Sequence, residues 1–245
     1  MCKLGRKLCM GLMFCFATVA QAQSFVKAEN DTTVIAEYLD GRVWAYRQLG
    51  DVLVGMTNYM VKDYGKFYQV AFYIKNLGDK AITFNPEEIF SVLHNRKGEL
   101  EVLKVHSYEN YMKKVNRSQA WTMALLEVSA GLSAGFAGYQ TSQTTVYQPG
   151  KAPYTQRTTS YNYAAASAAN SLSQLQIMEY AKMMRDDKHI ISKGYLKMTT
   201  MHPNESIFGY VNIEREKGEL MTVGVYIDGH KYLFDWDVSL KKKRR

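Results

Sequence analysis

The sequence predicts a mainly β protein, an antiparallel β-sandwich interrupted by a helical hairpin. Two stretches, residues 23–106 and 191–240, hold short runs rich in Val, Ile, Tyr, Phe and Thr, separated by turn residues. Between them, residues 107–190 lack this alternation and have helical composition on both sides of a polar link. A chain of 245 residues, 47% of them hydrophobic, is long enough to bury a core without disulfides.

The first β block begins with a two-residue hairpin. Asp40-Gly41 separates an apolar run at 34–39 from one at 42–48, and Asp-Gly accepts the positive φ of a type I′ turn. Within residues 66–76, apolar side chains alternate with polar ones, so every second residue lies on one face. That face is predicted to line the core, and its residues are Tyr68, Val70, Phe72 and Ile74.

The second β block predicts a three-strand meander. Apolar residues alternate along 207–213, 221–227 and 231–238. Turn residues at 216–218 and at 228–229 separate the three runs. The inward-facing residues of the last strand are predicted to be Tyr232, Phe234, Trp236 and Val238.

The inserted segment predicts two antiparallel helices, at about residues 109–139 and 161–187. The polar link at 140–160 contains Pro149-Gly150 and Pro153 and is predicted to be a loop or partly disordered. Small residues recur every three or four positions in both helices, and such stripes let two helices approach closely. The candidate interaction surface consists of Ala130, Gly131, Ala134, Gly135, Gly138, Ala164, Ala168 and Ser171.

The sequence leaves open two kinds of surface that this hairpin could contact. The small-residue stripes favour a protein partner or self-association through the hairpin. The apolar stretch 120–139 makes membrane association through residues 107–188 the alternative, although Glu127 and several Ser and Gly residues interrupt this stretch.

The N-terminus predicts export. Three basic residues precede an apolar run at 8–20, and Ala20-Gln21-Ala22 matches a signal-peptidase site, so cleavage of the signal peptide 1–22 is expected after Ala22. All three cysteines lie in this segment, so the mature chain would have no disulfide, thiol nucleophile or cysteine-ligated metal. A periplasmic or cell-envelope location in a bacterium is therefore expected.

The positive charge is confined to the two ends of the chain. The formal net charge is +8, but three cations lie in the signal segment and five in the tail 241–245, so the region between them is neutral. The tail is a candidate contact with anionic lipid or other envelope polyanions. A nucleic-acid role is not expected behind a signal peptide. The tail residues are Lys241, Lys242, Lys243, Arg244 and Arg245.

No constellation of residues predicts a chemical activity. Residues 131–135 match G-x-S-x-G, but a nucleophile elbow needs a strand before the serine in a parallel framework. The five histidines show neither an i,i+4 pair nor a Glu-x-x-His pattern. The protein is therefore expected to be non-enzymatic and without a cofactor or metal, and a serine hydrolase using Ser133 is the remotest alternative.

Two segments resemble the immunoglobulin-like domains of bacterial exported proteins. His202-Pro203-Asn204-Glu205-Ser206, followed by an alternating strand, is similar to their "Pro-Gly-Glu-Ser" entry strand, with Asn204 in place of the usual glycine. Phe84-Asn85-Pro86, after the strand that ends at Asn76, is similar to their opening. The resemblance covers about residues 66–106 and 193–238 and implies an immunoglobulin-like sandwich. It carries over no catalytic residues and implies a binding or assembly module.

Overall fold

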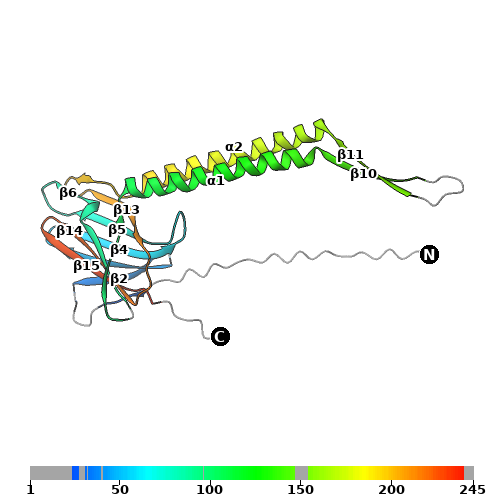
Figure 1. The fold of residues 1–245 in the computed structure, drawn as a ribbon. Helices are drawn as coiled ribbons and strands as arrows, with labels where there is room; N and C mark the ends of the chain where they lie inside the picture. Colours follow the sequence, from blue (N-terminus) through cyan, green and yellow to red (C-terminus); the bar gives the residue numbers. More distant parts are fainter. Residues whose placement is uncertain are drawn as a thin grey trace, which may run out of the picture.

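A body of antiparallel β-sheets carries a long arm made of two helices (Figure 1). This computed structural model describes residues 24–27, 31, 33–39, 41–95, 97–146 and 154–239. The predicted signal peptide and the basic tail lie outside the described residues. The chain is mainly β with two helices, which confirms the predicted class at that level.

The first large sheet has six strands, and β9 is its edge strand at the root of the arm. In spatial order they are β2 (Val34–Leu39), β3 (Arg42–Leu49), β4 (Val52–Val61), β5 (Phe67–Asn76), β13 (Ser206–Glu214) and β9 (Val105–His106). The predicted hairpin at 40–41 is confirmed, since Leu39 pairs with Arg42. Asp40 itself lies outside the described residues, and Gly41 has the positive φ of 77° that this turn requires.

The second large sheet has five strands. In spatial order they are β1 (Ser24–Phe25), β15 (His230–Asp237), β14 (Leu220–Ile227), β7 (Ile89–His94) and β8 (Leu100–Leu103). The turn at Asp228-Gly229 is a two-residue hairpin, as predicted, because Ile227 pairs with His230 and both turn residues have positive φ. A small two-stranded sheet pairs β6 (Ile82–Phe84) with β12 (Thr199–Met201), and the short 3₁₀ helix η1 (Pro86–Glu88) follows β6.

The predicted three-strand meander is wrong. β13 pairs with β5 and β9, whereas β14 pairs with β15 and β7 in the other sheet. The segment between β13 and β14 crosses from one sheet to the other, and it passes so close to Leu93 that a Cβ on Gly218 would lie 2.5 Å from that side chain. A hairpin and a crossover both direct alternate apolar residues toward the core, so the sequence pattern could not distinguish them.

The inner faces of the two large sheets share one hydrophobic core. The predicted inward residues of β5, namely Tyr68, Val70, Phe72 and Ile74, are all buried. So are Tyr232, Phe234, Trp236 and Val238 at the C-terminal strand. The Tyr232 hydroxyl connects the sheets directly, because it donates to the carbonyl oxygens of Leu49 (2.8 Å) and Val52 (3.1 Å).

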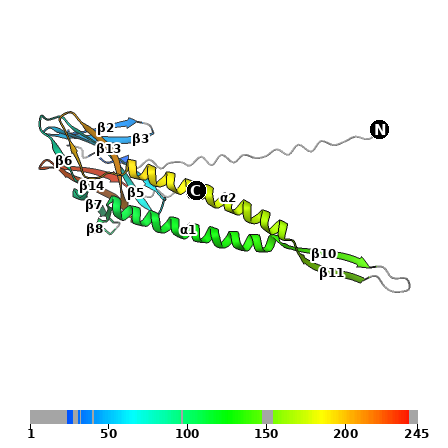
Figure 2. The same cartoon turned by 90° about the horizontal axis from the view of Figure 1, so that it is seen from above.

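The arm consists of α1 (Tyr108–Ala137), β10 (Tyr139–Val146), β11 (Tyr154–Tyr161) and α2 (Tyr163–Gly194). Figures 1 and 2 show the two helices leaving the body as one antiparallel pair that ends in the β10–β11 ladder. The helical hairpin was predicted, but the loop prediction for 140–160 is wrong where the structure describes this segment. Thr residues with high β propensity form a ladder there instead.

Candidate functional site

The root of the arm is an aromatic cluster on the outer face of the six-stranded sheet. The ring of Tyr111 in α1 stacks on Tyr195, just after α2, with centroids 5.3 Å apart. Phe67 meets Tyr111 edge-on at 5.6 Å, and Tyr210 of β13 meets Tyr195 at 5.2 Å. The Tyr195 hydroxyl donates to the carbonyl of His106 (2.7 Å) and accepts from the backbone N–H of Asn212 (3.1 Å). These contacts fix both helices to strands β5, β9 and β13.

The turn between β4 and β5 braces the root from the side. The Gln119 amide donates to the Tyr64 hydroxyl (2.9 Å) and to the carbonyl of Met184 (3.1 Å), so it joins this turn, α1 and α2. The Tyr64 hydroxyl in turn donates to Asp187 (2.8 Å). Tyr64 adopts a left-handed φ of 54°, which is uncommon for a tyrosine and places its ring against the arm.

His106 is a buried titratable group at this root. Burial lowers its pKa, and the ammonium group of Lys114, 3.4 Å from Nε2, lowers it further. The carboxylate of Glu214 lies 4.0 Å away and acts in the opposite direction, but it is half exposed. We therefore assign a neutral imidazole whose Nε2 accepts from Lys114. Burial also raises the pKa of Tyr111 and Tyr195, which keeps both hydroxyls protonated.

The inner faces of the two helices pack against each other along the arm. In α1 the least exposed residues beyond the root recur every three or four positions, at Met123, Leu126, Ala130 and Ala134. The sequence-predicted residues Ala130 and Ala134 therefore lie on the face toward α2. Gly138 closes the end of α1, where a Cβ would lie 2.4 Å from the ring of Tyr161.

The other predicted small residues lie on faces that no part of the described chain covers. A Cβ added at Gly131 or at Gly135 would meet no atom within 4 Å. Ala164, Ala168 and Ser171 are exposed as well, because α2 turns a different face toward α1. The structure thus places Ala164, Ala168 and Ser171 on the outer side of the arm and does not bring them onto Ala130 and Ala134.

The outer face of α1 carries a continuous stripe of large apolar side chains, which we call the α1 stripe. Its members are spaced by three or four residues, so they share one helix face. Each is 54–72% exposed. The α1 stripe consists of Trp121, Leu125, Val128, Leu132 and Phe136. The sequence shows that this region is apolar but does not separate this stripe from the inner face, because both faces consist of apolar residues.

Charge is distributed unevenly along the arm. The parts of α1 and α2 farthest from the body, residues 118–137 and 163–181, contain only Glu127 and Glu179 as charged residues. The ends of both helices near the body contain Lys113, Lys114 and Arg117 in α1 and a mixture of acids and bases in α2. By length and composition α1 could cross a membrane, the one helix among the described residues that could. The 20 residues from 118 to 137, with Glu127 as their one charge, form about 30 Å of helix.

An aromatic cluster marks the junction between the helices and the tip ladder. Tyr139 and Tyr161 meet edge-on with centroids 5.1 Å apart, and Tyr161 meets Tyr163 at 4.8 Å. The β10–β11 ladder beyond it is polar, with Thr, Ser and Gln on its exposed faces.

Ser133 lies inside α1, where its hydroxyl donates to the carbonyl of Ala130 at 3.0 Å. This is helical backbone and not the strand-to-helix turn of a nucleophile elbow. Among the residues that the structure describes, no group of three or more His, Cys, Asp or Glu side chains could hold a metal ion.

The body also contains a basic cavity that was not predicted from the sequence. The predicted polyanion contact at 241–245 lies outside the described residues. The only sequence signal for the cavity is four separate cations next to strand ends, a pattern common on solvated surfaces. Comparison of the chain with protein-family models, curated proteins and solved structures finds no match in any of the three.

Proposed function

We propose that the protein is an exported, non-enzymatic assembly module of the bacterial envelope, in which an immunoglobulin-like β-sandwich holds a helical arm and copies of the chain associate through their arms. The observation that carries this proposal is the α1 stripe. A helix whose large apolar side chains are 54–72% exposed leaves apolar area for a partner to bury.

The size of the stripe indicates how it would be used. Burying a large apolar side chain from full exposure contributes about 1.5–3 kcal/mol, so the five partly exposed members together would contribute on the order of 5–9 kcal/mol. Association costs about 4–15 kcal/mol in lost freedom of motion. One stripe meeting a poorly matched surface would therefore only offset this cost, and a stable contact needs a complementary face.

The opposite side of the arm offers such a face. The hydrogen bonds from Asn162 N–H to Gly138 O (2.6 Å) and from Gln119 to Met184 O set the relative height of the two antiparallel helices. Phe136 and Leu132 therefore stand at about the height of Ala164 and Ala168. Large side chains on the outer face of α1 and small ones at the same height on the outer face of α2 would fit if α1 of one copy packed on α2 of the next.

An α1-to-α2 contact joins two different surfaces, so each copy keeps one free surface of each kind. Such contacts produce rings if they close and filaments if they do not. This arrangement supports an assembly of several copies with the β bodies on one side and the polar tips on the other.

Sedimentation velocity of the mature protein tests the proposal. We expect wild type to associate in a concentration-dependent manner and the Leu132→Glu/Phe136→Glu variant to sediment as a monomer. The matched control is Leu100→Glu/Val102→Glu on β8, where both residues are at least as exposed (65% and 79%) but do not belong to the α1 stripe. The proposal fails if wild type is monomeric up to its solubility limit, or if the arm variant and the control associate equally.

Membrane insertion of the arm is the second candidate, favoured by the length and apolar composition of α1. Its weakness is α2, where Asn170, Gln174 and Gln176 are exposed and would place side-chain amides in hydrocarbon. Flotation with phosphatidylcholine vesicles distinguishes the candidates. Insertion predicts that wild type floats and Leu132→Glu/Phe136→Glu does not, whereas assembly in water predicts that neither floats.

A further inference from the structure

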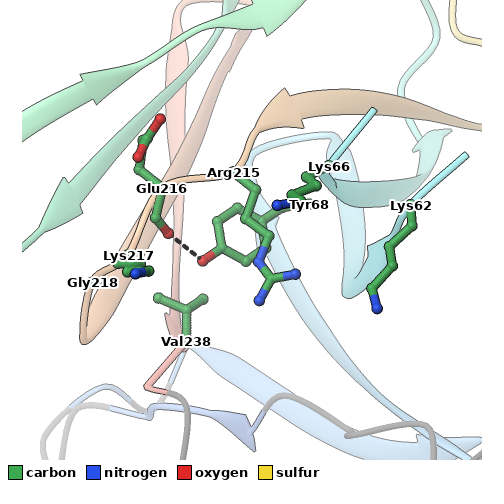
Figure 3. A pocket seen from close by; sticks show the side chains of 8 residues that line it. All are labelled: Lys62, Lys66, Tyr68, Arg215, Glu216, Lys217, Gly218 and Val238. Atoms are coloured by element: carbon green, nitrogen blue, oxygen red, sulfur yellow. Dashed lines mark hydrogen bonds between the residues drawn. The ribbon is translucent and has the colours of Figure 1, made fainter. Parts of the chain in front are cut away.

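A cavity of about 550 Å³ opens at the end of the body where the turn after β4 meets the crossover from β13 to β14 (Figure 3). It belongs to neither the α1 stripe nor the aromatic root. Its lining residues are Lys62, Lys66, Tyr68, Arg215, Glu216, Lys217, Gly218 and Val238.

The lining is strongly cationic. It holds four cations, Lys62, Lys66, Arg215 and Lys217, against the single acid Glu216. Figure 3 shows the Glu216 carboxylate directed away from Tyr68, while the carbonyl of the same residue accepts from the Tyr68 hydroxyl (2.9 Å). The two salt bridges found among the described residues involve none of these cations. Within the described part of the protein, none of the four is therefore held in an ion pair.

The walls of the cavity are fixed by the fold. Tyr68 belongs to the core and is only 2% exposed, so its ring forms a rigid floor. The backbone N–H of Arg215 donates to the carbonyl of Lys66 (3.3 Å), which ties the two cationic rims together. The Arg215 guanidinium lies beside the Tyr68 ring in Figure 3 and partly opposes the rise that burial causes in the pKa of Tyr68. Gly218 is held against Leu93 at the crossover.

The charges and their spread indicate the class of ligand. Lysine ammonium groups are mobile point charges that suit an anion with several acceptor oxygens, and the half-buried Arg215 adds a planar donor. A carboxylate has one negative charge and two acceptor oxygens. These are too few to bind four cations that lie on two opposite rims of the cavity. A phosphate group carries up to two negative charges and several oxygens, and it matches this set better.

We propose that this cavity is a binding site for a phosphate group, either free or as the terminal group of a larger molecule such as a lipid. Lys62 and Lys66 approach it from one rim, and Arg215 and Lys217 from the other. In a larger ligand, the Tyr68 ring and Val238 would lie beside the portion next to the phosphate.

Isothermal titration of the mature protein with inorganic phosphate at low salt is the test. We expect saturable binding that weakens as ionic strength rises, because the contacts are between charges. Lys66→Glu/Lys217→Glu should weaken binding at least about tenfold, since each lost charge-assisted hydrogen bond has an effect of that order. The control Lys80→Glu/Lys97→Glu changes the net charge equally at exposed lysines outside the cavity and should change affinity less than about twofold.

Cosedimentation with phosphatidylcholine vesicles containing phosphatidic acid separates the two sources of phosphate. Cavity-dependent binding of inorganic phosphate assigns a free group, and cavity-dependent binding of the vesicles alone assigns a lipid headgroup. The proposal is overturned if the cavity variant and the control bind both probes equally, which would place any binding elsewhere, or if acetate binds as tightly as phosphate.

Discussion

Gly131 and Gly135 on the outer side of α1 test whether this face of the helix is exposed to solvent in the monomer. Glycine in a helix interior is less stable than alanine by about 0.5–1 kcal/mol, because it loses more conformational freedom on folding. A Cβ at Gly131 or Gly135 would meet no atom within 4 Å, so nothing in the isolated chain offsets this gain. The Gly131→Ala/Gly135→Ala variant should therefore stabilise α1 by about 1–2 kcal/mol.

Native-state hydrogen exchange of α1 amides in dilute, monomeric protein measures this change. In the distal half of α1 only Ala130 is buried, so we expect this part to open without unfolding the body. A gain of about 1–2 kcal/mol should then slow exchange there by a factor of about 5–30. Gly138→Ala is the matched opposite, because its Cβ would lie 2.4 Å from the Tyr161 ring and force that ring to move. It should speed exchange near the tip, with a cost of about 1–3 kcal/mol.

The same double variant should have the reverse effect on assembly. If the α2 face of a second copy packs beside the glycines, two added methyl groups occupy the space that it needs, and association weakens while the monomer becomes more stable. Faster exchange in the monomeric double variant would refute the conclusion that this face of α1 is open.

Three further predictions concern the body. Tyr232→Phe removes the hydroxyl that donates to both Leu49 and Val52 and should lower the urea-unfolding free energy by about 1–3 kcal/mol; an unchanged midpoint contradicts this role. Because the pKa of His106 is lowered in the folded state, the unfolded chain binds a proton more readily, and stability should fall as pH drops below about 6.5. His106→Phe should flatten that part of the thermal midpoint profile, and an identical slope in both proteins would count against it. Asp228→Val should destabilise the β14–β15 hairpin by about 1–2 kcal/mol, because its φ is 50°, whereas Asp228→Gly should be nearly neutral by calorimetry.

The strands and their inward faces could be predicted because alternation follows from burial on one side. Phe72 and Trp236 were identified as core residues from this pattern alone, and both are fully buried. The pairing of β13 and β14 could not be predicted, since the residues at 216–218 are equally suited to a turn and to a crossover. Pairing partners are determined by packing across the whole body.

The sequence predicted the two helices of the candidate site and their small residues, but it did not predict which face of the arm each residue lies on. Small residues identified two close-packing helices, yet only the structure shows that Ala130 faces α2 while Gly131 and Ala168 face outward. Adjacent residues on a helix differ by about 100° in direction, so an error of one residue in the interface changes the assignment. The cavity was invisible because Lys66 and Arg215 are distant in sequence and meet only through strand pairing.

The length of the arm determines how a force at its tip acts on its root. Helix α1 with its 30 residues, extended by the 8 residues of β10, reaches about 70 Å from the sheets. The contacts of Tyr111, Val115 and Gln119 that hold it span only about 12 Å. A sideways force at the polar tip is therefore multiplied about fivefold at the aromatic root, as in any lever. A single arm would bend at its root under a small load. Arms packed side by side would divide the load among several roots, so the assembly would be stiffer than one arm.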